Sequence, residues 1–258
     1  MNWHISKSLA ACLGFAMFTA TSAYAQETIK IGVSEPLTGP VAASGTYVTN
    51  GARIAADYVN QNGGVLGKKL QLVIEDNKSN PREAVNSVEK LILKDKVPVL
   101  MGAWSSTFTL AVMPKLLEYG VPMVVETASS SKITTAGNPW VFRTSPTSAM
   151  EAKAFAKLID SYSPAIKKVD FLAVNNDWGL GAAVEFKKML EAKGIAIGRT
   201  ETMTPDMTDL SAQLAALKGS GSRHRHRNFR YRTTDTGNPP GRRTTFATTH
   251  YHHRWFFP

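Results

Sequence analysis

The sequence has a single cysteine, Cys12, and no histidine between residues 5 and 223. One thiol cannot form an intramolecular disulfide, and the missing imidazoles argue against histidine-dependent catalysis and histidine metal sites. The chain also lacks the GxGxxG, GxxxxGKS/T, GxSxG and HExxH patterns of nucleotide sites, hydrolases and zinc proteases. Asp76 resembles the ribose-binding acid of a dinucleotide site, but the glycines that such a site needs are absent. We therefore expect no enzyme, no metal ion and no cofactor.

Aliphatic residues are missing from the last part of the sequence. Residues 223–258 contain no Leu, Ile, Val, Met, Lys or Glu, and their eight arginines face one aspartate, Asp235. This segment therefore supplies +7 of the formal net charge of +10, and residues 1–222 carry an ordinary +3. Because the charge is local, it says little about the folded body, and the segment matches no nucleic-acid-binding module. We expect no nucleic-acid partner.

Residues 1–25 have the organisation of a secretory signal peptide. Lys7 supplies the positive charge, residues 9–20 form a short apolar run, and Ala-Tyr-Ala at residues 23–25 is a small-x-small cleavage site. The apolar run is too short to span a bilayer. Residues 9–12 resemble a lipoprotein cleavage box, but almost no apolar run precedes them. We predict cleavage after residue 25, which removes Cys12, and export to a periplasm.

From residue 26 to residue 218, short apolar segments alternate with segments of helical spacing. The apolar segments predict strands at residues 29–33, 70–74, 97–101, 121–125, 169–174 and 195–203. Helical spacing predicts helices at residues 46–60, 107–119, 150–159, 184–192 and 210–218, and one that starts near residue 80 with Pro81 at its first position. Such alternation implies an α/β fold with parallel sheets covered on both faces.

The irregular segment TTAGNPWVFRTSP, residues 134–146, separates two such series. We predict a first lobe at residues 26–144 and a partial second lobe at residues 145–221, with a cleft between them. In open parallel sheets, ligands bind at the carboxyl ends of strands, beside the N-termini of helices. The loops that follow the strands are therefore the candidate binding elements.

Two of these loops are rich in hydroxyl groups. MGAWSST, residues 101–107, places Ser105 and Ser106 at the start of a predicted helix, and ETASSSKIT, residues 126–134, presents Thr127 and Ser129. Serines at such positions commonly cap a helix by accepting hydrogen bonds from backbone N–H groups. Alternatively, hydroxyl and N–H groups of both loops converge on the carboxylate of a small ligand. The residues alone leave both interpretations open.

A third loop, NNDWGLG at residues 175–181, follows a strand of the second series. Its Trp178 is either a buried packing residue, the usual fate of tryptophan, or a flat apolar lid over a ligand in the cleft. The sequence does not choose between the two.

Five segments together resemble one known family. They are IKIGVSEPLTGPVAASG, NGGVLGKKLQLVIEDNKSNPREAV, MGAWSST, PWVFRTSP and NDWGLG, in this order between residues 27 and 218. The chain resembles the leucine/isoleucine/valine-binding protein family, the extracytoplasmic solute-binding subunits of branched-chain amino acid ABC importers. The resemblance implies the type I periplasmic-binding-protein fold, in which two α/β lobes, each a parallel sheet with helices on both faces, close on a ligand.

The resemblance also implies roles for individual residues. Ser106, with Ser105 beside it, matches the hydroxyl donor to the ligand carboxylate. Thr127 and Ser129 lie where family members hold the carboxylate and ammonium groups of the ligand. Trp178 matches an aromatic residue of the second lobe that packs on the ligand.

Two departures from the family pattern concern the same site. Ser44 stands where many leucine-binding members have tyrosine, and this smaller residue implies a pocket that is not strictly leucine-sized. The acid that neutralises the ligand ammonium in the family comes from a part of the fold beyond Lys218, for which this chain offers no match.

The resemblance implies a periplasmic solute-binding protein for an amino acid or a related small carboxylate. It would bind without chemistry, as a monomer, and deliver its ligand to the permease and ATPase subunits of an ABC importer. An exported sensory domain of the same fold, which hands its ligand to a receptor, is the alternative.

We interpret residues 222–258 as an out-of-frame continuation, because they begin abruptly where the family fold requires a buried strand. With suitable third codon bases, reading from residue 223 one nucleotide later gives the aliphatic sequence Asp-Ile-Asp-Ile-Ala-Thr-Ser-Gly-Ile. A genuine disordered basic tail is the alternative. A second lobe cut short in this way would expose apolar surface, so we expect the chain to fold poorly and to bind no ligand tightly.

Overall fold

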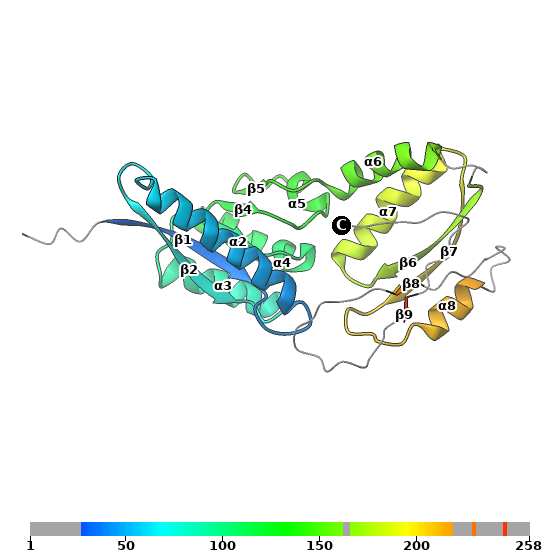
Figure 1. Cartoon of the computed structure of the whole chain (residues 1–258), viewed down its shortest axis with the longest axis horizontal. Helices are drawn as coiled ribbons and strands as arrows, with labels where there is room; N and C mark the ends of the chain where they lie inside the picture. Colours follow the sequence, from blue (N-terminus) through cyan, green and yellow to red (C-terminus); the bar gives the residue numbers. More distant parts are fainter. Residues whose placement is uncertain (1–26, 162–165, 219–228, 231–244, 247–258) are drawn as a thin grey trace, which may run out of the picture.

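The computed structural model of the chain describes residues 27–161 and 166–218, together with residues 229–230 and 245–246. It contains two lobes of alternating strands and helices, at the left and the right of Figure 1. The predicted signal peptide, residues 1–25, lies outside the described residues. Of the tail predicted from residue 222 onward, two short strands are described, β8 (Phe229–Arg230) and β9 (Thr245–Phe246), which pair antiparallel.

Within the described residues, the first lobe is built on a five-stranded parallel sheet. Its strands are β1 (Thr28–Glu35), β2 (Lys69–Asp76), β3 (Leu100–Gly102), β4 (Met123–Val125) and β5 (Val141–Arg143), in the order β2-β1-β3-β4-β5. The chain moves from β1 outward to β2, then crosses back to β3 and continues in the opposite direction. The carboxyl ends of β1 and β3 therefore border the reversal of strand order, where doubly wound sheets have their binding crevice.

The helices of this lobe are α2 (Ala42–Gln61), α3 (Pro81–Leu93), α4 (Ser106–Tyr119) and α5 (Lys132–Thr135). Because crossovers between parallel strands are right-handed, the reversal after β2 places α2 on one face of the sheet and α3 and α4 on the other. α3 packs along α4 and onto β1 and β2. The main hydrophobic core lies on that face and includes the fully buried side chains of Val88, Leu91, Leu100, Val112, Leu116 and Met123.

Local sequence explains where α3 begins. The side-chain oxygen of Asn80 accepts hydrogen bonds from the N–H groups of Arg82 at 2.8 Å and Glu83 at 3.3 Å. Pro81 occupies the first helical position, as predicted, where its missing N–H costs no hydrogen bond. The helix therefore starts where capping and ring geometry favour it.

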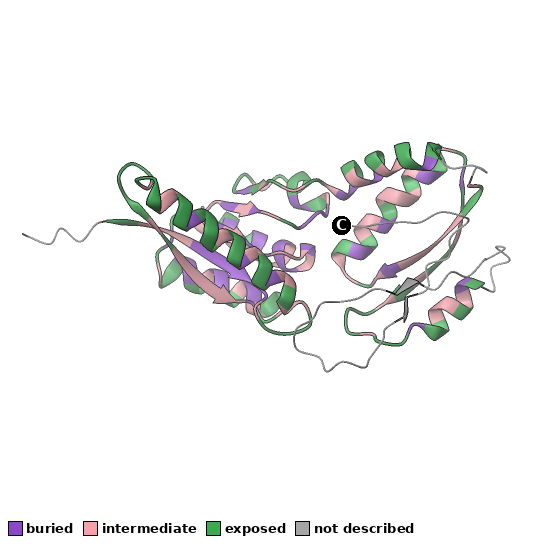
Figure 2. Cartoon of the chain, in the orientation of Figure 1, coloured by how far each residue is buried: buried purple, intermediate pink, exposed green. Residues whose placement is uncertain are grey.

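The second lobe contains α6 (Ser148–Asp160), β6 (Lys168–Val174), α7 (Asp177–Ala192), β7 (Ala196–Met203) and α8 (Ser211–Lys218). β6 and β7 pair in parallel, α6 packs along α7, α7 packs on both strands, and α8 packs on β7. In Figure 1, α6 and α7 lie above these strands and α8 lies below them. The buried cluster of this lobe comprises Ile159, Leu190 and Ile195. Figure 2 shows correspondingly little buried chain here, compared with the first lobe.

The alternation of strands and helices agrees with the prediction, but several boundaries differ. α2 starts at Ala42 and α7 at Asp177, both earlier than the apolar spacing indicated. Polar and glycine-rich first turns, such as that of α7, do not show the apolar period on which the prediction depends. α5 and β5, of 4 and 3 residues, are too short for any periodicity and were not predicted.

Candidate functional site

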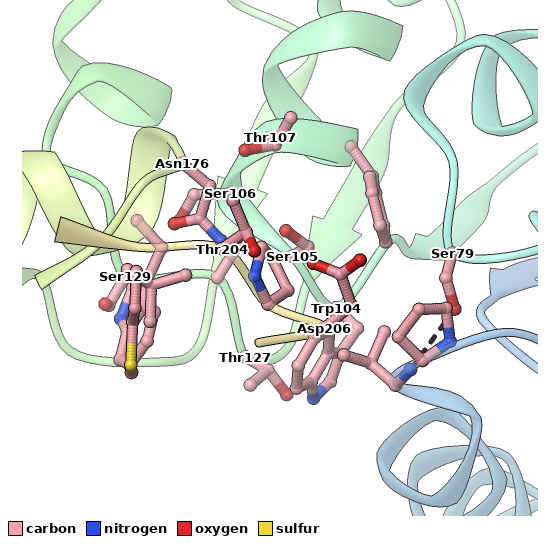
Figure 3. Close-up of a pocket in the computed structure, with 18 of the residues that line it drawn as sticks. Ser79, Trp104, Ser105, Ser106, Thr107, Thr127, Ser129, Asn176, Thr204 and Asp206 are labelled. Carbon is pink, nitrogen blue, oxygen red and sulfur yellow. Dashed lines mark hydrogen bonds between the residues drawn. The ribbon is translucent and has the colours of Figure 1, made fainter. Parts of the chain in front are cut away.

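A cavity of about 750 Å³ lies between the two lobes. Its lining comes from the loops after β1, β2, β3, β4 and β7, from the end of β6 and from the starts of α4, α6 and α7. The lining residues are Pro40, Val41, Ser79, residues 104–108, residues 127–129, Glu151, Val174, Asn176, Trp178 and residues 203–207. Figure 3 shows the labelled side chains of Ser106, Asn176 and Thr204, from both lobes, around one space. The cavity thus occupies the crevice beside the reversal of strand order, and its volume suits a small molecule.

The N-terminus of α4 opens onto this cavity. Ser105 is its N-cap residue, yet the Ser105 side chain makes no capping hydrogen bond. Ser106 is 1 % exposed, and its Oγ accepts a hydrogen bond from the N–H of Ser130 at 3.1 Å. A hydroxyl that accepts one hydrogen bond still has its own proton to donate. Ser106 therefore joins the two hydroxyl-rich loops that the sequence singled out, and neither serine is the side-chain cap that one interpretation expected.

Arg143 holds the loop that follows β4. Its guanidinium donates hydrogen bonds to the carbonyl oxygens of Ala128 at 3.1 Å and Ser130 at 2.9 Å, and to the hydroxyl of Thr134. Three contacts from one planar, charged group fix the path of the loop. The backbone beside the cavity is therefore positioned by a residue that does not line it.

The same loop presents the other predicted hydroxyl groups. Thr127 is exposed at the cavity, whereas Ser129 is buried and its hydroxyl lies 3.1 Å from that of Ser148 in α6. The backbone N–H of Ser148 also donates to the carbonyl oxygen of Ser129 at 2.7 Å. The loop after β4 is therefore tied to the first turn of the second lobe.

The second lobe contributes the N-terminus of α7. Asn176 caps this helix, because its side-chain oxygen accepts a hydrogen bond from the N–H of Gly179 at 2.8 Å. Gly179 has no room for a side chain, since a Cβ atom there would lie 2.2 Å from the carbonyl oxygen of Val174. Trp178 remains 46 % exposed and lines the cavity. The structure therefore favours the aromatic wall at the cleft over the buried packing residue.

A direct hydrogen bond joins the two helix N-termini. The N–H of Asp177 in α7 donates to the hydroxyl of Thr107 in α4 at 3.2 Å. Each helix N-terminus carries a partial positive charge from its unpaired N–H groups. Two such ends at one cavity make an environment in which a carboxylate is stabilised.

Asp76 holds the loop after β1, which contributes Pro40 and Val41 to the cavity. Its carboxylate accepts hydrogen bonds from the N–H of Leu37 at 2.8 Å and from the hydroxyl of Thr38 at 2.6 Å. Partial burial raises the pKa of Asp76, but the hydrogen bonds from Thr38 and neighbouring backbone outweigh it and lower the pKa below its ordinary value. Asp76 is thus a structural anchor.

Trp104 lines the cavity and was not predicted. It has a positive φ of 61°, a left-handed conformation that is costly for a residue with a side chain. The backbone N–H of Trp104 donates to Oε1 of Glu126 at 3.1 Å, and this hydrogen bond helps to hold the left-handed conformation. The two residues are 22 positions apart. No local motif marks such a contact, so the sequence offered no signal for it.

Glu126 lies beside a second buried acid, Glu35. Glu35 is 0 % exposed, and neither of its carboxyl oxygens has a hydrogen-bond donor among the described residues. Burial and then the charge of Glu126 raise the pKa of Glu35 to about 10, and burial also raises the pKa of Glu126. The two carboxyl groups can hydrogen-bond each other when one of them keeps its proton.

Glu151, from α6, and Asp206, after β7, also line the cavity without having been predicted. Burial raises the pKa of the Glu151 carboxyl, against the opposing effects of a hydrogen bond from Ser129 and the charge of Arg143.

Within the described residues, no three His, Cys, Asp or Glu side chains are grouped so that they could hold a metal ion. In the same part of the chain, no helix is both long and apolar enough to cross a membrane.

Ser44 is the predicted site residue that the structure does not bring to the cavity. It lies in the first turn of α2 and is absent from the cavity lining. The next residue, Gly45, is packed so closely that a Cβ atom would lie 2.1 Å from the carbonyl oxygen of Pro36. Because α2 begins at Ala42, this turn is fixed against the start of the loop, and Pro40 and Val41 reach the cavity instead.

The model of the periplasmic binding protein family matches residues 28–223. The chain belongs to the periplasmic binding protein family. The Leu/Ile/Val-binding protein BraC3 of Rhizobium johnstonii is 34 % identical over 213 residues, which are 82 % of this chain and 57 % of that protein. The leucine-, isoleucine-, valine-, threonine- and alanine-binding protein of Pseudomonas aeruginosa is 32 % identical over 212 residues, 82 % of this chain and 55 % of that protein.

Solved structures of the periplasmic binding protein family agree with this assignment. The branched-chain amino acid transporter substrate-binding protein LivJ from Streptococcus pneumoniae, in complex with isoleucine, has a TM-score of 0.68 and 30 % identity, and covers 75 % of this chain and 54 % of that chain. A solute-binding protein of an ABC transporter from Rhodopseudomonas palustris, in complex with p-hydroxybenzoic acid, has a TM-score of 0.68 and 32 % identity, and covers 76 % of this chain and 52 % of that chain.

These comparisons confirm the predicted two-lobed fold and the predicted family resemblance. The relatives are named as binding proteins, in agreement with the expectation that the chain is not an enzyme. The chain spans 57 % of the length of the Rhizobium protein and 54 % of the LivJ chain, so it covers little more than half of these relatives.

Proposed function

We propose that the chain is an extracytoplasmic solute-binding protein that captures an amino acid or a related small carboxylate between its lobes. The observation that carries this proposal is the meeting of the N-termini of α4 and α7 at one cavity. Ser106 adds a buried hydroxyl whose proton is available, and Trp178 adds an aromatic wall. A small carboxylate would find N–H and O–H donors at one side and apolar surface at the other.

The partners follow from the same proposal. A protein that binds without chemistry must hand its ligand to another component, and we propose the permease and ATPase subunits of an ABC importer. The names of the solved relatives, which describe substrate-binding proteins of transporters, support this assignment. We propose that the chain acts as a monomer.

Export to the periplasm is part of the proposed function. Lys7, the apolar residues 9–20 and the small residues around position 25 support a cleavable signal peptide. Expression in a Gram-negative host, followed by N-terminal sequencing of the periplasmic fraction, should give a chain that starts at Gln26. Retention of the uncleaved chain in the cytoplasm would contradict export.

The binding experiment is a titration of the purified chain with a panel of amino acids and small carboxylates. Trp104 and Trp178 line the cavity, so their fluorescence should change when it is occupied. Ligand-observed NMR detects weak binding as well. Competition between ligands would show that they share one site, whereas a panel without any binder would contradict the proposal.

We also propose that the second lobe limits the stability of this chain. Among the described residues, the buried cluster of this lobe contains three residues, Ile159, Leu190 and Ile195, against sixteen in the first lobe. Val184 is 63 % exposed and Leu180 is 43 % exposed. Apolar surface that remains in water contributes nothing to folding. Thermal unfolding should therefore be broad, with the second lobe melting first and tight binding absent. A sharp, cooperative transition that ligand shifts upward would contradict this.

A further inference from the structure

Charged side chains around the cavity have one sign. Among the described residues that line it, Glu151 and Asp206 are acidic, and none is Lys, Arg or His. A ligand whose only charge is a carboxylate would meet two acids and no basic side chain. The N-termini of α4 and α7 stabilise a carboxylate at one end of the cavity, but they leave the negative charges of Glu151 and Asp206 without a cationic partner in the lining. The lining is therefore better matched by a ligand that also carries a positive charge.

Glu151 is the acid that the fold holds in place. It lies in the first turn of α6 and is half-buried, whereas Asp206 is exposed in the loop after β7. An opposite charge interacts more strongly where water is excluded than at an exposed position. Glu151 lines the cavity and is also near Ser129, a residue of the hydroxyl-rich loop. Of the two acids, Glu151 is therefore the better placed to interact with a positive charge on a ligand.

Arg143 is the basic side chain near Glu151, but it does not occupy the place of a ligand cation in the cavity. Its guanidinium donates to the carbonyl oxygens of Ala128 and Ser130 and to the hydroxyl of Thr134, and Arg143 is not part of the cavity lining. Its charge moderates the cost of burying Glu151, but its N–H groups are directed at the loop. Glu151 therefore retains acceptor capacity on the side of the cavity.

We propose that Glu151 accepts the ammonium group of the ligand, so that the cavity selects small zwitterions over carboxylates that lack a cationic group. This inference rests on the proposed function, because it places the carboxylate of the same molecule at the N-terminus of α4. It separates two kinds of ligand found in similar solved structures. Isoleucine carries an ammonium group, whereas p-hydroxybenzoic acid does not.

The test compares two probes that differ mainly in the amine. Leucine and 4-methylpentanoate share a carboxylate and a branched carbon chain, and p-hydroxybenzoate serves as the aromatic carboxylate. Their affinities for the chain are measured by competition in ligand-observed NMR, which gives ratios even when binding is weak. We expect leucine to bind about 10- to 100-fold more tightly than 4-methylpentanoate, the range for a hydrogen bond to a charged group.

The variant Glu151→Gln removes the charge and keeps the size of the side chain. It should weaken leucine binding by about 10- to 100-fold and change 4-methylpentanoate binding by less than about threefold. Glu151→Asp should restore part of the preference. Glu191→Gln, which changes an exposed glutamate at the end of α7, is the matched control and should leave both affinities unchanged.

Three results would overturn the inference while leaving the proposed function intact. The first is equal binding of leucine and 4-methylpentanoate, or tighter binding of p-hydroxybenzoate, by the unaltered chain. The second is an equal loss for both probes in Glu151→Gln, which indicates a structural role. The third is loss of the preference in Asp206→Asn with none in Glu151→Gln. Failure of every probe to bind would instead overturn the proposed function, and this inference with it.

Discussion

The replacement of Glu35 by glutamine should stabilise the protein at neutral and alkaline pH. Glu35 ends β1, is 0 % exposed, and has no hydrogen-bond donor to either oxygen among the described residues. Burial and the neighbouring Glu126 raise its pKa from 4.5 to about 10. In the unfolded chain the carboxyl loses its proton near its ordinary pKa, whereas in the folded chain it keeps it. The folded state therefore binds more protons than the unfolded state between these two values.

The sign and size of the effect follow from this difference. Where the folded state binds the extra proton, stability falls as pH rises, by about 1.4 kcal/mol per pH unit for one group. The unfavourable contribution of Glu35 to stability is thus absent below its unfolded pKa and grows as pH rises toward its folded pKa. Between the ordinary pKa of 4.5 and pH 7, the accumulated cost is at most about 3.5 kcal/mol. An amide has no such proton to keep, and its N–H can donate to Glu126.

The assay is urea unfolding of the unaltered chain and of Glu35→Gln at several pH values between 5 and 9, followed by far-ultraviolet circular dichroism. The two free energies of unfolding should be similar near pH 5, and the variant should gain as pH rises. Glu191→Gln, an exposed glutamate, should keep the pH slope of the unaltered chain. Identical slopes in Glu35→Gln and the unaltered chain would refute the reasoning, since they would mean that Glu35 is ionised in the folded state.

Three further predictions concern other parts of the molecule. In a full-length version with a restored reading frame, Ser106→Ala should weaken binding of the best ligand by about 1–3 kcal/mol and also destabilise the fold, because the buried N–H of Ser130 loses its acceptor. Unchanged affinity in calorimetry would remove Ser106 from the site. Asp76→Asn should destabilise the chain by about 1–2 kcal/mol at pH 7. The Asp76 pKa is lowered in the folded state, so this contribution is lost as pH falls below its ordinary value of 3.8, and a difference that persists undiminished in acid would contradict the anchor role. Resequencing the gene should reveal a shifted reading frame near codon 222, whereas an intact frame, with the same Arg/His-rich segment in related genes, would defeat the frameshift hypothesis.

Much of the fold could be predicted because it depends on patterns that are local in the sequence. Most strands are apolar runs of a few residues, and most helices show apolar residues three or four apart, so the sequence predicts the alternation of strands and helices. Asn80 and Pro81 mark the start of α3 for the same reason, since a helix cap involves neighbouring residues. Elements without such patterns, namely α5 and β5, were missed.

The candidate site was predictable only in part. Parallel strands bring their carboxyl ends to one edge, so the loops that contain Ser106, Thr127 and Trp178 were expected to meet, and they line one cavity. Ser44 was placed there on resemblance alone. It is absent from the lining because the start of α2 is set by close packing against Pro36, which no local pattern reveals.

The sequence by itself determined the alternation of strands and helices, the hydroxyl-rich loops and the family. Only the tertiary structure decided which residues surround the cavity and how they are charged. Trp104 depends on Glu126 and the cavity gains Glu151 from α6, and these relations join loops and helices from different parts of the chain. Burial raises the pKa of both Glu35 and Glu151. The exposure of a carboxyl group to water depends on everything packed around it, so it exists only once the chain has folded.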